Sequence, residues 1–191
     1  LNNGLLREND AADFIITDNL QDFNILATYI NGQKVAENGR TLISSIPSIP
    51  VNNFVCNNKS AEDFRIPATD SNAATAAVKV IEAMDGQLIT NAITAQLPIK
   101  EGAILNDAQQ DVLKLAVVNR YREMPVATAF IRGFGLKQGA IASSVAHDSH
   151  NIIAVGVDDE SICAAVNGVI AHKGGISIAD KTGVDVLPIP V

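Results

Sequence analysis

The sequence predicts an α+β fold in two parts. A small β unit over residues 1–45 is followed by a linker over 46–70 and a strand-rich mixed α/β domain over 71–191. Three observations support this prediction. Asn31-Gly32 lies between two apolar runs, which is the strongest short-range signal of a β-hairpin. Prolines and asparagine clusters interrupt regular structure in the linker. A single amphipathic helix pattern lies between two apolar strands near the C-terminus.

The first part is predicted to consist of short strands. Residues 12–16 and 24–30 are compact apolar runs, and 33–36 is the return strand of the hairpin. Asn31-Gly32 is the dipeptide preferred in a type I′ turn, because both central residues of that turn need a positive φ.

The second part is predicted to be mostly strands. Residues 76–83 fit either a strand or a helix, and the Val-Lys-Val-Ile-Glu core favours a strand. The other expected strands are 88–99, ending at Pro98, then 112–118, 126–132, 140–146 and 152–157.

The helix follows the strand 152–157. Asp158-Asp159-Glu160 supplies a cap and acidic residues for its first turn, and Lys173-Gly174-Gly175 supplies a basic residue and glycines at its end. Apolar residues lie on one face, at Ile162, Ala165, Val166, Val169 and Ile170. A strand is expected over 175–179. The unit 152–179 is therefore a β-α-β crossover, for which parallel pairing of the two strands is the usual arrangement.

Composition excludes several classes of function. The net charge of −7 disfavours binding to nucleic acid. No apolar stretch approaches the roughly 18 residues of a membrane span, and no basic segment marks a signal peptide at the start. Cys56 and Cys163 lie far apart and are expected to be buried thiols in a reducing cytoplasm, with a disulfide as the alternative. Because the chain does not begin with Met, it is expected to start inside a longer protein.

The candidate functional segment is Ala146-His147-Asp148-Ser149-His150-Asn151, between two apolar strands. Imidazoles titrate near neutral pH, and a neighbouring carboxylate can fix their tautomer. In an extended chain Asp148 and His150 share a face, whereas in a helical turn His147 and His150 do. Two interpretations stay open: a strand end that contacts a substrate or a metal-bound water, and a polar corner whose side chains satisfy the backbone.

Other candidate groups have simpler interpretations. His172 is expected at the helix C-terminus, and Arg120, Arg122 and Arg132 are expected to be solvated or ion-paired. The sequence has no HExxH, no P-loop, no G-x-S-x-G and no cytidine-deaminase zinc motif. It therefore does not encode a complete catalytic metal site.

Several stretches resemble the adenine deaminase family of the amidohydrolase superfamily. Gly4 and the run 9–15 are similar to the segment that follows the amidohydrolase barrel, although the usual second glycine is replaced around residues 8–10. The hairpin 29–35 resembles the small β-sandwich that flanks that barrel. The runs 131–144 and 147–156 resemble adenine deaminases specifically, and Ala165-Val166-Asn167 and Gly174-Gly175-Ile176 continue the resemblance. Residues 1–45 would then be the end of the β-sandwich, and 71–191 the family's C-terminal domain.

The resemblance implies hydrolysis of adenine to hypoxanthine and ammonia by a water bound to a divalent metal, manganese or iron. The metal would lie in a barrel that precedes residue 1, and no ligand of it is assigned here. His147, Asp148 and His150 become candidates for contacting the substrate or orienting catalytic groups, and Ser149 and Asn151 for binding the substrate. The preceding barrel, adenine and further copies of the chain are the expected partners, and the cytoplasm is the expected location. The 191 residues alone are expected to be inactive. The alternative is a structural or oligomerisation module of an amidohydrolase that acts on another cyclic amide or amidine.

Overall fold

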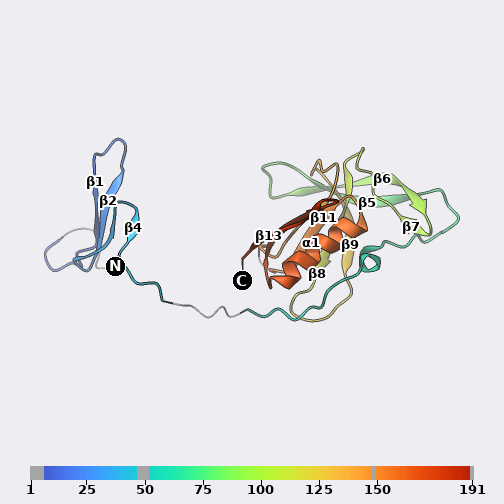
Figure 1. The fold of residues 1–191 in the computed structure, drawn as a ribbon. Coiled ribbons are helices and arrows are strands. Elements are labelled where there is room, and N and C mark those ends of the chain that lie inside the picture. Colours follow the sequence, from blue (N-terminus) through green and yellow to red (C-terminus); the bar gives the residue numbers. More distant parts are fainter. Residues whose placement is uncertain (1–6, 47–51, 148, 190–191) are drawn as a thin grey trace. The chain divides into compact units, whose positions relative to one another are not determined.

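The computed structural model describes residues 7–46, 52–147 and 149–189. The chain divides into two compact units, Leu1–Ile49 and Pro50–Val191 (Figure 1). Both units are dominated by strands, so the predicted strand-rich α+β class is confirmed. Among the described residues no helix is long and apolar enough to cross a membrane.

The first unit contains one antiparallel sheet with the strand order β1-β2-β3-β4. Its strands are β1 (Phe14–Thr17), β2 (Ile25–Ile30), β3 (Gln33–Glu37) and β4 (Arg40–Thr41). The predicted hairpin is confirmed, since Asn31 and Gly32 have φ values of 50° and 74°. The Asp13 carboxylate accepts a hydrogen bond of 2.7 Å from the Asn31 backbone N–H, which ties the turn to β1. Phe14 and Tyr29 stack across the sheet with ring centroids 4.6 Å apart.

The second unit is built on one nine-stranded sheet with the order β13-β12-β10-β11-β8-β9-β5-β6-β7. The pair β5–β9 is parallel, and the other strand pairs described are antiparallel. Its strands are β5 (Thr75–Ala83), β6 (Thr90–Lys100), β7 (Ala103–Ile104), β8 (Val112–Val118), β9 (Ala127–Arg132), β10 (Ala140–Ser143), β11 (Ile152–Gly156), β12 (Gly175–Asp180) and β13 (Gly183–Pro188). A short 3-10 helix, η1 (Ala61–Phe64), precedes them.

The predicted helix is confirmed as α1 (Asp159–Ala171). Asp158 caps it, because its side chain accepts a 2.6 Å hydrogen bond from the Ser161 N–H. His172 ends the helix, with its Nδ1 2.9 Å from the Gly168 carbonyl oxygen.

The expected pairing around α1 was wrong. Strands β11 and β12 run in the same direction, but β10 lies between them and pairs antiparallel with both. The β-α-β unit is therefore split. β10, which precedes both strands in the sequence, forms the backbone hydrogen bonds to each of them. The local sequence pattern does not predict that β10 lies between them.

Other elements also differ from prediction. β6 continues through Pro98 to Lys100 and does not end at the proline. Pro98 lies opposite Thr75, the first residue of β5. β10 ends at Ser143, three residues before the expected end at 146. The edge strand β13 was not among the expected strands; Pro188 is its last residue, where a missing N–H is tolerated.

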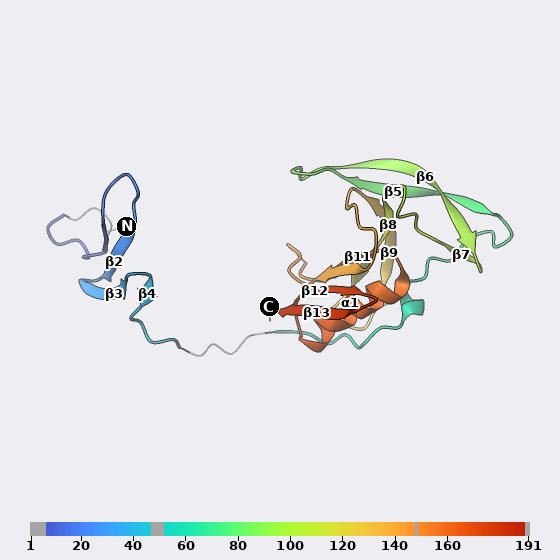
Figure 2. The ribbon, with the colours of Figure 1, turned by 45° about the horizontal axis from the view of Figure 1, so that its top comes forward.

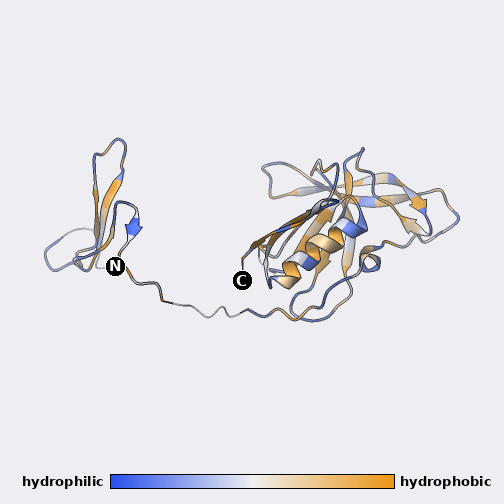
Figure 3. Cartoon of the chain, viewed as in Figure 1, coloured by the Kyte–Doolittle hydropathy of each residue, from blue (hydrophilic) through white to orange (hydrophobic). Residues whose placement is uncertain are grey.

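Helix α1 packs on one face of the sheet, against β10, β11, β12 and β13 (Figures 1 and 2). Most of the sheet residues under it are small, among them Ala140, Ala142, Ala154, Ser177 and Ala179. They let the helix approach closely, so that Ile162, Ala165, Val166 and Val169 on the helix are fully buried. The alternating colours along α1 in Figure 3 show its apolar and polar sides. Gly156 in β11 is part of the same close approach, because an added Cβ would lie 2.6 Å from both Ala140 and Ile162.

An ion pair lies at the start of the helix. The ammonium group of Lys114 in β8 binds the carboxylate of Asp159, the first residue of α1. The Lys114 side chain is 3% exposed and that of Asp159 is 24% exposed. The buried member of the pair is therefore the cation, and Asp159 offsets its desolvation.

We predict that the two partners of this pair are not equivalent. Asp159→Asn leaves the Lys114 ammonium buried without a counter-charge and should lower the free energy of unfolding by about 3 kcal/mol. Lys114→Met removes the buried charge and leaves Asp159 near water at a helix N-terminus, where a carboxylate is favourable, so its cost should be below about 1 kcal/mol. Urea unfolding of both variants measures the difference. Equal losses would contradict the assigned role of Asp159.

Candidate functional site

The predicted polar segment forms a tight turn between β10 and β11. The His150 backbone N–H donates to the Ala146 carbonyl oxygen at 2.8 Å, and the Ser149 N–H donates to the His147 oxygen at 3.0 Å. His150 has a φ of 50°, the left-handed conformation, which is uncommon for a residue with a side chain. The extended alternative for this segment is therefore wrong. Asp148, one of the predicted site residues, lies outside the described residues.

His150 is the chemically distinctive residue of the turn. Its side-chain Nδ1 is buried, and it has no hydrogen-bond partner in the described parts of the chain. Buried polar atoms in native proteins are nearly always paired, so one without a partner needs an explanation. The other imidazole of the turn, on His147, is exposed. The structure thus distinguishes the two histidines, which the sequence treats as equivalent.

Ser149 and Asn151 hold the turn against the end of β8. The Tyr121 hydroxyl donates to the Ser149 carbonyl oxygen at 2.8 Å. The Asn151 side-chain oxygen accepts from the Arg120 backbone N–H at 3.4 Å. Ser149 Oγ accepts from the Asn151 N–H at 3.3 Å. In this structure the Asn151 side-chain oxygen and the Ser149 hydroxyl both make contacts that fix the shape of the turn.

Arg120 is a buried member of the site, whereas the sequence placed it at the surface. The residue is 5% exposed, although we expected a solvated or surface ion-paired group. Its guanidinium donates to Asn52 Oδ1 at 3.1 Å and to the Tyr121 hydroxyl at 3.2 Å. The same group lies 4.8 Å from the Tyr121 ring centroid and 5.7 Å from that of Phe54, distances at which a cation and a ring attract.

The segment that precedes η1 also contacts Arg120 and Glu123. The backbone N–H groups of Val55 and Cys56 both donate to the Arg120 carbonyl oxygen, at 2.7 and 3.3 Å. Lys59 forms an ion pair with Glu123. The Asn57 backbone N–H and the Lys59 ammonium bind the Glu123 carboxylate and lower its pKa. Residues from three separate parts of the sequence, 52–59, 119–123 and 146–151, therefore meet at this end of the sheet.

The site has no recognisable metal centre in the described part of the chain. No group of three His, Cys, Asp or Glu side chains there lies close enough to hold a metal ion. The donor set of a metal-activated water is therefore not present among these described residues. Cys56 and Cys163 are free thiols, and burial raises the pKa of both.

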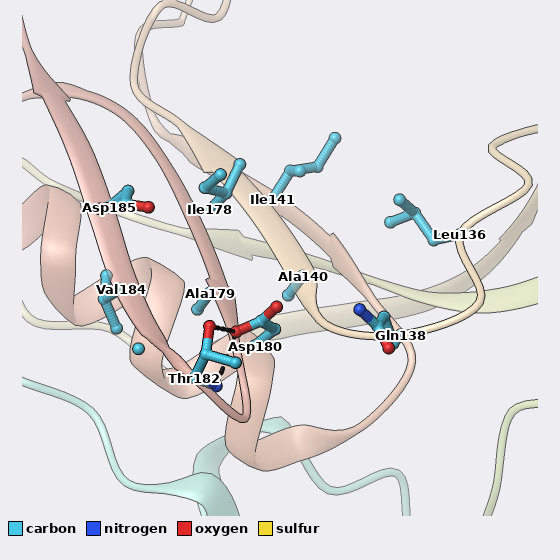
Figure 4. A pocket seen from close by; sticks show the side chains of 11 residues that line it. Leu136, Gln138, Ala140, Ile141, Ile178, Ala179, Asp180, Thr182, Val184 and Asp185 are labelled. Atoms are coloured by element: carbon cyan, nitrogen blue, oxygen red, sulfur yellow. Dashed lines mark hydrogen bonds between the residues drawn. The ribbon is translucent and has the colours of Figure 1, made fainter.

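A surface depression lies elsewhere, at the β10–β12–β13 side of the sheet. It has a volume of about 460 Å³ and is lined by Leu136, Ile141, Ile178, Asp180 and Asp185, among others (Figure 4). Asp180 there accepts a hydrogen bond from the Thr182 hydroxyl at 2.5 Å and closes the β12–β13 turn. Its lining combines aliphatic side chains with two carboxylates and lacks a histidine. The turn 146–151, which carries two histidines, is therefore the better candidate for a functional site.

We predict that the turn depends on the Tyr121 hydroxyl. Tyr121→Phe removes the hydrogen bond to Ser149 and should speed amide exchange at residues 149–151 by roughly tenfold, the equivalent of about 1.4 kcal/mol. Tyr29→Phe is a matched control, because Tyr29 is the other tyrosine of the chain and stacks on Phe14 in the first unit. Hydrogen exchange read by mass spectrometry measures both variants. Unchanged exchange at 149–151 in Tyr121→Phe would show that the contact does not hold the turn.

Comparison with known proteins gives the family. A sequence model described as the adenine deaminase C-terminal domain matches residues 87–191. A protein of Salinibacter ruber named adenine deaminase is 48% identical over 189 residues, which are 98% of this chain and 34% of that protein. Proteins of the same name from Methanosarcina mazei and Borreliella burgdorferi are 45% and 39% identical, over 100% and 98% of this chain. The chain spans about a third of the length of these curated relatives. The chain therefore belongs to the adenine deaminase family and corresponds to its C-terminal portion.

Proposed function

We propose that the complete protein hydrolyses adenine at C6, consuming water and releasing hypoxanthine and ammonia. The observation that carries this proposal is that relatives at 38–48% identity over nearly the whole chain are named adenine deaminase. This chain covers about a third of each of them. The proposal assigns the reaction to the complete polypeptide and a supporting role to the 191 residues.

In this proposal the hydrolytic water is activated by a divalent metal, manganese or iron, which lowers the pKa of the bound water. The ligands would come from a barrel that precedes residue 1, because the residues described here offer no suitable cluster. We also propose a cytoplasmic location, which is supported by the two free cysteines.

Within the complete enzyme, we propose that the turn 146–151 contacts adenine or shields the hydrolytic water. The support comes from His150, whose buried Nδ1 has no partner within the described residues. Adenine offers ring nitrogens that accept hydrogen bonds and an exocyclic amine that donates them. Either could pair with an imidazole nitrogen of the suitable tautomer. Asp148 and His147 would orient or extend this contact, and Ser149 and Asn151 would line it.

The second candidate is a structural or oligomerisation module, in an enzyme that acts on adenine or on another cyclic amide or amidine. One observation favours it: Ser149 and Asn151 use several of their polar groups to close the turn on β8. A homo-oligomer is then expected, and the turn would be a polar corner with no role in turnover.

Kinetics of the complete protein separate the two candidates. His150→Ala should lower kcat/KM for adenine by roughly 10- to 100-fold, the loss expected when one polar contact to the substrate is removed. Asp148→Ala should lower it in the same direction. His172→Ala is the matched control, because His172 ends α1 and contacts the Gly168 carbonyl. Its kcat/KM should be unchanged.

The outcomes are distinct. Unchanged kcat/KM in both His150→Ala and Asp148→Ala would favour the structural module. An equal loss in His172→Ala would point to a general effect on folding and would also count against a substrate contact.

The 191-residue chain by itself should not deaminate adenine, because its described residues hold no metal cluster. Ammonia release from adenine by the purified chain, measured with and without added manganese, tests this expectation. Turnover that depends on the metal would place the catalytic site within these 191 residues and overturn the division of roles.

A further inference from the structure

The face of the sheet opposite α1 is apolar and uncovered at its β13 side. The row of residues nearest to the turn 146–151 runs across five strands in register: Leu187, Ile176, Ser143, Ile153 and Val117. We call the face of the sheet opposite α1 the open face. Leu187, Ile176 and Ile153 are 60%, 40% and 37% exposed.

The next row of the open face is similar. Asp185, Ile178, Ile141, Val155 and Leu115 lie side by side in register. In Figure 4 the side chains of Asp185, Ile178 and Ile141 lie along one side of the strands, with Leu136 beyond them. Val155 is covered by Leu136 and its neighbours, whereas Ile178 is 53% exposed. Asp185 is the one charged residue of the two rows.

Strand β12 shows that this face is not adapted to water. An antiparallel strand with one solvated face normally points apolar residues inward and polar residues outward. In β12 the pattern is reversed: Ser177 is 1% exposed under α1, and Ile176 and Ile178 point outward. Ser177 satisfies its hydroxyl by donating to the Ala165 carbonyl oxygen at 2.5 Å. Contiguous apolar patches of this kind mark surfaces that other protein covers.

Two depressions make the open face a shaped surface. Besides the depression of about 460 Å³ near Ile141 and Ile178, one of about 320 Å³ is lined by Ile176, Ile178 and Leu187. Both lie on β12 and β13, at the uncovered edge of the sheet. They can receive side chains of a partner surface.

We infer that the open face binds the part of the same polypeptide that precedes residue 1. The relatives are about three times as long as this chain, which matches their C-terminal portion. A domain attached to the same chain is present at a high effective concentration, so a patch of modest size suffices to hold it. The open face also borders the candidate site, since Ser143 ends β10 just before the turn 146–151 and Ile153 is the second residue of β11, just after it. This inference rests on the proposed function and names the surface by which the chain would join the rest of the enzyme.

Thiol labelling tests this inference without any need for catalysis. Ile178→Cys and Ile153→Cys place a thiol on the open face, and Ala171→Cys is the control. Ala171 is exposed and is the last residue of α1, which packs on the opposite face of the sheet. Burial raises the pKa of the natural Cys56 and Cys163 thiols, so they should react slowly with a maleimide.

The labelling rates are compared between the 191-residue chain and the longer polypeptide that includes the preceding segment. In the short chain the three introduced thiols should react at similar rates. In the long polypeptide Ile178→Cys and Ile153→Cys should react at least roughly tenfold more slowly, and Ala171→Cys at an unchanged rate. Equal rates at Ile178→Cys in both proteins would overturn the inference. Protection that appears in the short chain alone, and grows with its concentration, would also overturn it and assign the face to a second copy.

A failure of the proposed function would give a different experimental result from a failure of the inferred interface. A long polypeptide that protects the open face but releases no ammonia from adenine would refute the proposed reaction and keep the inferred interface.

Discussion

The close packing of α1 on small residues of the sheet is the constraint on which the second unit depends. Alanines, a serine and Gly156 line the sheet beneath the helix, and larger residues there would push it away. Because close-packed interiors tolerate little change in volume, the small side of the sheet and the helix face must match as a pair. The β10 strand takes part twice, since Ala140 and Ala142 both lie in this contact. Its position between β11 and β12 is therefore part of the same constraint.

The small residues under α1 also affect the composition of the open face. A strand alternates its side chains, so small residues on the α1 side leave the intervening positions to supply the apolar bulk. In β12 and β11 these positions carry Ile176, Ile178 and Ile153, which remain partly exposed. Burial of such side chains would stabilise the protein by roughly 25 cal/mol for each Å² removed from water. In the second unit, α1 thus covers one face of the sheet. The other face would gain free energy from a partner.

Local signals predicted much of this fold. The Asn31-Gly32 turn and the Asp158 cap are each fixed by neighbouring residues, and both were found where the sequence places them. Non-local choices were not predictable in this way. The insertion of β10 between β11 and β12 depends on pairing between distant segments, and β13 ends with a proline that is tolerated only because the strand lies at an edge. The same holds for the site. The polar segment 146–151 is visible in the sequence, but the burial of Arg120 depends on Asn52 and Phe54, which come from a distant part of the chain.

The exposed apolar row of the open face and the turn that carries His150 lie next to each other. The row that includes Ile153 and Ile176 lies at the end of the sheet that carries the turn with His150. The His150 Nδ1 is already buried by the chain itself, so a surface that covers the row takes no further water from that atom. The cost of the unpaired nitrogen is therefore present before any partner binds. The gain from covering the row comes instead from the apolar side chains of Ile153, Ile176 and Leu187, which are 37%, 40% and 60% exposed. The two contributions are separate, so a partner that covers this row can stabilise it through apolar contacts without changing the surroundings of Nδ1.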